Sequence, residues 1–149
     1  MKLSFHCLAL IAGLALAARA QTPTPPSANL GAAVFEWSKL EAKPTKNGER
    51  RNVFDAPTAT FAHLECHITT LNPGEVAHPM HRHPDEEIIV VKEGTMEVTI
   101  AGKVQQAGPG SVIFYASNVE HGMRNVGTTR ATYHVFRIVT AATPKAATP

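Results

Sequence analysis

The sequence predicts an all-β fold, and three observations support this. Short apolar and β-branched runs recur at roughly 8–12-residue spacing between turns rich in glycine and proline, which is typical of a sandwich or small barrel. No stretch of helical periodicity is longer than two turns. The 149 residues, 44% hydrophobic and 17% charged, suit one globular domain of about 100–150 residues.

The first 20 residues predict an export signal of the general secretory (Sec) type. Lys2 gives a positive start, residues 8–18 are apolar, and Ala18-Arg19-Ala20 is a small-x-small cleavage pattern, so cleavage is expected after Ala20. The apolar run is shorter than the about 20 residues that span a bilayer; an uncleaved membrane anchor is the alternative. We expect a periplasmic or secreted protein with no stable membrane span after cleavage.

Cleavage would change the charge and the cysteine content. Without Lys2 and Arg19, the 14 basic residues become 12, which equals the 12 acidic residues. A neutral chain offers no electrostatic argument for a nucleic-acid partner. Cys66 would be the single cysteine, which excludes an internal disulfide and favours a small buried side chain.

The mature chain divides into a domain between two tails. Residues 21–31 are rich in proline, threonine and serine, and residues 141–149 read AATPKAATP. Both are expected to be disordered, because neither has apolar periodicity. The folded domain is therefore expected at 32–140.

The expected strands follow from alternation and turn residues. They are, in chain order, 34–37, 51–54, 61–70, 87–92, 95–100, 111–115 and 131–139. In the third, Cys66 and its even-numbered neighbours share one face, and Glu65 and His67 lie on the other. Glu93-Gly94 is predicted to be the turn of a hairpin, and residues 101–103 a second tight turn.

Histidines provide the candidate metal ligands, since five of the seven expected in the mature chain lie between His63 and His83. His81 and His83 share one face of an extended chain, and Glu87, four residues later, keeps that parity. His121 follows an expected strand and precedes Gly122, where the backbone can turn. Imidazole and carboxylate together suit Zn, Fe, Mn, Ni or Cu. A surface histidine pair, or a tract that binds metal loosely, would show the same spacing.

Residues 73–94, PGEVAHPMHRHPDEEIIVVKEG, resemble the first motif of the cupin family. That motif has glycine, a spacer, His-x-His, three or four residues, glutamate, six residues and glycine. The spacings to Glu87 and Gly94 fit, whereas the spacer after Gly74 is six residues where five is usual.

Residues 110–125, GSVIFYASNVEHGMRN, resemble the second cupin motif. Its glycine, histidine and asparagine are spaced as expected. Ala116 replaces the usual proline and Asn118 the usual glycine, which affects a loop. Two motifs in the expected order identify the chain as similar to small single-domain cupins of the RmlC-like type.

The resemblance implies a jelly-roll β-barrel of two antiparallel sheets, with one divalent metal held by His81, His83, Glu87 and His121. Three neutral ligands and one anion leave a divalent ion one positive charge and open positions, which suits Lewis-acid chemistry or O₂ activation. Small metal cupins include dioxygenases, isomerases and lyases, so the resemblance implies a small-molecule substrate. A non-catalytic module that binds a small ligand or a metal is the alternative, because fold does not determine function.

Further expectations concern the surroundings of the metal and the oligomer. The catalytic residues are not predicted, and the candidates for substrate contact or for support of the ligands are His78, His67, His134 and Asn125. Each histidine could equally fill a surface or core position. A homodimer is expected, with the apolar segment 33–40 packing against a neighbouring barrel.

Overall fold

The computed structural model describes residues 29–145. The expected signal peptide at 1–20, most of the lead-in at 21–31 and the last four residues of the expected tail lie outside this range. Within 29–145, no helix is long and apolar enough to cross a membrane.

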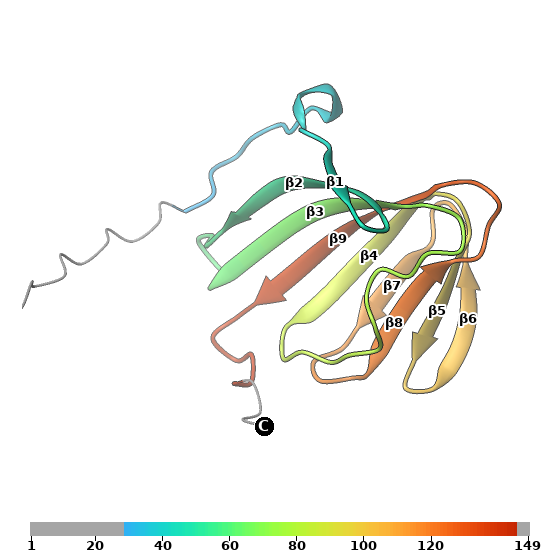
Figure 1. Ribbon diagram of the computed structural model, residues 1–149. Coiled ribbons are helices and arrows are strands. Elements are labelled where there is room, and N and C mark those ends of the chain that lie inside the picture. The colour runs from blue at the N-terminus through green and yellow to red at the C-terminus, as the bar shows by residue number, and fades with distance from the viewer. Residues whose placement is uncertain (1–28, 146–149) are drawn as a thin grey trace, which may run out of the picture.

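The described residues form two antiparallel sheets, and the all-β prediction is confirmed. The larger sheet has the order β1-β2-β3-β9-β4-β7 and the smaller one β6-β5-β8, as Figure 1 shows. The strands are β1 Lys43–Thr45, β2 Gly48–Ala56, β3 His63–Leu71, β4 Glu86–Glu93, β5 Met96–Ile100, β6 Lys103–Ala107, β7 Val112–Tyr115, β8 His121–Asn125 and β9 Ala131–Val139.

The main core lies between the two sheets. Alternate residues of β4 and β9 face it, including Ile89, Val91 and Tyr133, each no more than 2% exposed. Met96 and Val98 of β5 cover them from the smaller sheet. Burying such side chains stabilises the fold by about 1.5–3 kcal/mol each.

The strand register places a polar row beside this core. Glu65 on β3 pairs with Arg137 on β9, which pairs with Glu87 on β4, which pairs with Tyr115 on β7. Two residues further along β3, His67 pairs with Val135 of β9. Residues two apart share a face, so the interior changes from charged to apolar along these strands.

The expected strand at 34–37 is wrong. Trp37–Lys39 is a short 3-10 helix, and an exposed ion pair joins Lys39 to Glu36 at 2.8 Å. The Trp37 ring lies over the side chain of Lys92 on β4, with the ammonium 3.5 Å from the ring centroid. A cation–π contact of this kind suits a half-exposed aromatic side chain.

The expected hairpin at Glu93-Gly94 is also wrong, because β4 and β5 lie in different sheets. β4 pairs with β7 and β9, and β5 pairs with β6 and β8. Gly94, at φ +84°, is where the chain leaves one sheet for the other. The second tight turn is confirmed: Ala101 and Gly102, both at positive φ, join β5 to β6.

Candidate metal centre

Three histidines from two segments, His81 and His83 before β4 and His121 at the start of β8, meet at one end of the barrel. His81 forms an isolated β-bridge with His121, with backbone N–O distances of 3.0 and 2.8 Å in the two directions. His83 follows two residues later, before β4. The turn expected at Gly122 is wrong, because Gly122 continues strand β8 and a Cβ there would lie 2.6 Å from the Met80 sulfur.

Backbone carbonyls fix the proton position on all three rings. The Nδ1 atoms lie 3.1 Å from the Pro79 oxygen for His81, 2.9 Å from that of Asp85 for His83, and 2.8 Å from that of Val119 for His121. A carbonyl only accepts, so each Nδ1 carries the proton and each Nε2 presents a lone pair.

These lone pairs converge as metal ligands would. One ring nitrogen from each of His81, His83 and His121 lies within 4.8 Å of the others. The Nε2 atoms of His83 and His121 are buried with no hydrogen-bond partner among the described residues. Metal-bound histidines usually donate their second nitrogen to a carbonyl or carboxylate, as these do. The three residues therefore fit a divalent transition metal.

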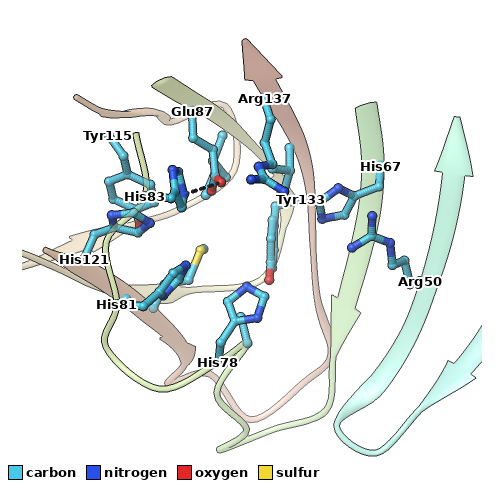
Figure 2. Close-up of a pocket in the computed structure, with 15 residues that line it drawn as sticks. Arg50, His67, His78, His81, His83, Glu87, Tyr115, His121, Tyr133 and Arg137 are labelled. Carbon is cyan, nitrogen blue, oxygen red and sulfur yellow. Dashed lines mark ion pairs between the residues drawn. The ribbon is translucent and has the colours of Figure 1, made fainter. Parts of the chain in front are cut away.

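Glu87 borders this group from β4. Its Oε2 lies 3.3 Å from Nε2 of His83, and a dashed line in Figure 2 marks this pair. This Nε2 has no hydrogen-bond partner among the described residues. Two lone-pair atoms at this distance repel unless a cation or proton lies beside them. Burial raises the pKa of Glu87, and the nearby His83 and Arg137 oppose the shift. Glu86, which has the opposite parity to Glu87 on the chain, is exposed.

The histidine group opens into a cavity of about 290 Å³. On the far side from His81, His83 and His121, Figure 2 shows His67 and Arg50, with Tyr133 and Arg137 between the two sides. Its apolar lining includes Ala77, Ile89, Met123 and Val135. Polar groups that converge on a cavity with some apolar lining are a feature of small-molecule sites.

His67 is buried and held by Glu65. Its Nδ1 lies 2.8 Å from Glu65 Oε1, so Nδ1–H donates to the carboxylate and Nε2 is left unprotonated. Burial, followed by the charge of Arg50, lowers the pKa of His67 to about 4, and Glu65 opposes the shift. His67 is therefore neutral at neutral pH.

This lowered pKa predicts acid sensitivity of the metal-free protein. Because the unfolded state binds a proton near pH 6.5 and folded His67 only near pH 4, the free energy of unfolding should fall as the pH drops through that window. His67→Gln lacks the titrating group, so its free energy of unfolding should fall by about 2–3 kcal/mol less than that of wild type. Urea unfolding of both proteins at pH 7 and 4.5 measures it, and equal losses in both would contradict the account.

The other candidate residues have different surroundings. His78 lines the cavity, with its ring 5.1 Å from that of His81, and burial lowers its pKa. His134 lies between two cavity-facing residues of β9 and so points to the opposite face of the sheet. Asn125 is fully buried; its amide donates to the carbonyls of Leu71, Asn72 and Thr129. Its role is structural, and His134 and Asn125 do not line the cavity.

Several polar residues around the cavity were not predicted. Arg137 donates from Nε to Asp85 at 2.6 Å, and the Asp85 carbonyl holds His83. Arg137 could have been found, since it shares parity with the apolar Tyr133 and Val135 in an expected strand. Arg50 lies one residue outside the expected strand at 51–54. The Tyr115 ring stacks on that of His121, with 3.9 Å between the ring centroids. In the sequence, Tyr115 is one more residue of an apolar strand, and nothing else there indicated a place at the cavity.

Comparison with known proteins agrees with this fold. Similar solved structures include an RmlC-like cupin from Shewanella frigidimarina, with 18% identity and TM-score 0.59 over 74% of this chain and 95% of that one. KdgF from Halomonas sp. has 18% identity and TM-score 0.61 over 72% and 94%. The polyketide cyclase RemF from Streptomyces resistomycificus has 21% identity and TM-score 0.59 over 73% and 80%. No curated protein matches the chain.

A family model adds evidence that is independent of these structures. The model described as the cupin domain matches residues 67–137, which include the three clustered histidines and Glu87. The matched range begins in β3 and ends in β9, so it includes every residue that lines the cavity except Arg50 of β2. Residues 67–137 therefore match the cupin domain, and the fold of the described residues is similar to that of solved cupin structures.

Proposed function

We propose that this cupin is an enzyme that acts on a small molecule at a divalent transition metal held by His81, His83, Glu87 and His121. One observation carries the proposal: three rings, oriented by backbone carbonyls, present lone pairs to one another at the wall of an open cavity. A purely structural zinc site would be closed. The bound ion, one of Zn, Fe, Mn, Ni or Cu, would supply Lewis acidity or O₂ activation.

Groups that are not ligands favour catalysis over simple binding. His67, neutral and oriented by Glu65, can accept a proton in the cavity. Tyr133 and His78 add polar atoms to the same wall. The name of RemF, a polyketide cyclase, is that of an enzyme on this fold. Dioxygenase-like or isomerase-like chemistry is the class that we propose.

Export and dimerisation belong to the proposal as well. The apolar run and the cleavage pattern before Gln21 support delivery to the periplasm or the exterior. Val34 and Trp37, 88% and 41% exposed in the described chain, support an apolar contact with a second copy.

The metal site is tested by titrating Zn²⁺ into the metal-free protein by isothermal calorimetry. Wild type is expected to bind one ion per chain. Glu87→Gln should weaken binding by at least about 10-fold, because the only anionic ligand is lost and the site charge rises from +1 to +2. Glu86→Gln is the matched control, since this exposed neighbour points away from the cluster. Equal affinities for the two variants would remove Glu87 from the ligand set.

The enzymatic part is tested with the same preparations. Turnover of a panel of small organic acids is followed by NMR, with an oxygen electrode in parallel, for the metal-loaded and the metal-stripped protein. We expect turnover that requires the metal and falls on His67→Gln. Equal turnover with and without metal would contradict the proposed function.

A further inference from the structure

The cavity has a cationic wall away from its histidine group. Arg50 reaches it from β2 and Arg137 from β9, with His67 of β3 nearby, as Figure 2 shows. The registers of β2 with β3 and of β3 with β9 bring together these strands, which are distant in sequence.

Each of the two guanidinium groups uses some of its N–H groups in hydrogen bonds to neighbouring side chains and leaves others available to a ligand. Arg50 donates from Nη2 to Glu65 at 2.5 Å and from Nε to Asn52 at 2.9 Å. Arg137 donates from Nε to Asp85 at 2.6 Å, and its Nη1 lies 3.8 Å from Glu65, beyond hydrogen-bond length. Among the described residues, Arg50 Nη1 and Arg137 Nη2 have no hydrogen-bond partner. Two anchored guanidiniums with spare N–H groups suit an oxyanion.

The charges around the cavity favour one negative charge on the ligand. Arg50 and Arg137 are balanced by Glu65 and Asp85, and Glu87 adds one negative charge. A divalent ion in the proposed site would leave the whole group at +1. A monocarboxylate would bring this net charge to zero. A phosphate ester carries a charge of about −1.5 to −2 near pH 7 and would leave the group negatively charged.

We propose that the cavity binds a small monocarboxylic acid whose carboxylate accepts hydrogen bonds from Arg50 and Arg137. The rest of the molecule then extends toward the histidine group, past His67. A cavity of about 290 Å³ lies just below the roughly 300–1,000 Å³ range of ligand pockets, which limits the acid to a few carbon atoms or one ring. This inference rests on the proposed function, because the metal supplies the net positive charge.

The test compares acids with their uncharged amides on zinc-loaded wild type. Acetate, lactate and benzoate are titrated by calorimetry against acetamide, lactamide and benzamide, which keep the shape and remove the charge. At least one acid should bind about 10-fold or more tightly than its amide, equivalent to about 1.4 kcal/mol. If no acid exceeds its amide, the proposal is overturned.

Arginine variants separate the cationic wall from the metal as the anion's site. Arg50→Gln and Arg137→Gln should each weaken the preferred acid by at least about 10-fold. Arg137→Lys keeps a cation beside Asp85 should the glutamine variant fail to fold, and should bind the acid more weakly than wild type. Arg124→Gln is the control, because this exposed arginine of β8 pairs with Glu97 at 3.0 Å and does not line the main cavity. Unchanged acid binding in all the variants would place the acid on the metal alone and overturn the proposal.

Zinc titrations of the same proteins keep the two proposals distinguishable. Arg50→Gln should bind zinc within about 3-fold of wild type, since Arg50 contacts neither the histidine group nor Asp85. Arg137→Gln should lower zinc affinity by no more than about 10–100-fold, because Arg137 holds Asp85, whose carbonyl orients His83. Wild type that binds no zinc would overturn the proposed function. Wild type that binds zinc but does not distinguish acids from amides would overturn only the carboxylate site.

Discussion

His81→Ala is expected to abolish tight metal binding, whereas His78→Ala is expected to leave the metal in place. His81 contributes one of the three convergent nitrogens, and its Nδ1 is already committed to the Pro79 carbonyl. Alanine removes that ligand, and water replaces imidazole poorly. Zinc affinity should fall by more than the about 10–100-fold typical of changes around a ligand. Calorimetric titration with zinc alone measures it.

His78 is the natural comparison, because it lies three residues earlier and its ring contacts that of His81. It lines the cavity but lies outside the convergent group. Removal of the His78 side chain should lower zinc affinity by no more than about 10–100-fold. Retention of zinc by His81→Ala together with release by His78→Ala would show that the six-residue spacer after Gly74 has moved the ligand to His78.

Local apolar patterning predicted much of the sheets, but it did not predict β1, β6 or β8. The strands β3, β5 and β9 carry apolar residues at alternate positions, and β4 and β7 contain continuous apolar runs. These strands and the central part of β2 were expected. β8, which begins at His121 and reads HGMRN, has no such alternation. β6 is exposed apart from Ala107. These two strands exist because each pairs with an edge of β5, which is a long-range property.

The candidate site also has one part that short motifs predict and another part that depends on long-range strand pairing. His81, His83, Glu87 and His121 lie in two short motifs, so the resemblance to the cupin motifs was enough to name them as candidate ligands. Arg50, Asp85 and Arg137 meet only through the pairing of β2, β3, β9 and β4 or through the loop before β4. Strand parity predicts that Arg137 shares a face with Tyr133, yet it cannot say which residue of another strand lies opposite.

Gly94→Ala is expected to be the most destabilising glycine substitution near the site, and Gly110→Ala provides a matched control. Both glycines have left-handed backbone, at φ +84° and +82°. A Cβ at Gly94 would lie 2.4 Å from the Ala131 Cβ and 2.5 Å from its Cα, whereas a Cβ at Gly110 would meet nothing within 4 Å. Both variants bear the left-handed backbone cost of about 1–2 kcal/mol; only one adds a clash with backbone.

Urea unfolding should therefore show a loss of about 1–2 kcal/mol for Gly110→Ala and of more than about 4 kcal/mol for Gly94→Ala. Equal losses would mean that β9 can shift away from Gly94 at little cost. The site should respond as well, since Gly94 follows β4, which carries Glu87, and Ala131 begins β9, which carries Arg137. Where Gly94→Ala still folds, displacement of β9 against β4 should weaken zinc binding, while Gly110→Ala should retain it. Both glycines belong to the motifs that resemble those of cupins, so the motifs alone do not distinguish them. Their neighbours in the fold show that Gly94 is needed for close packing as well as for backbone conformation, and Gly110 for backbone conformation alone.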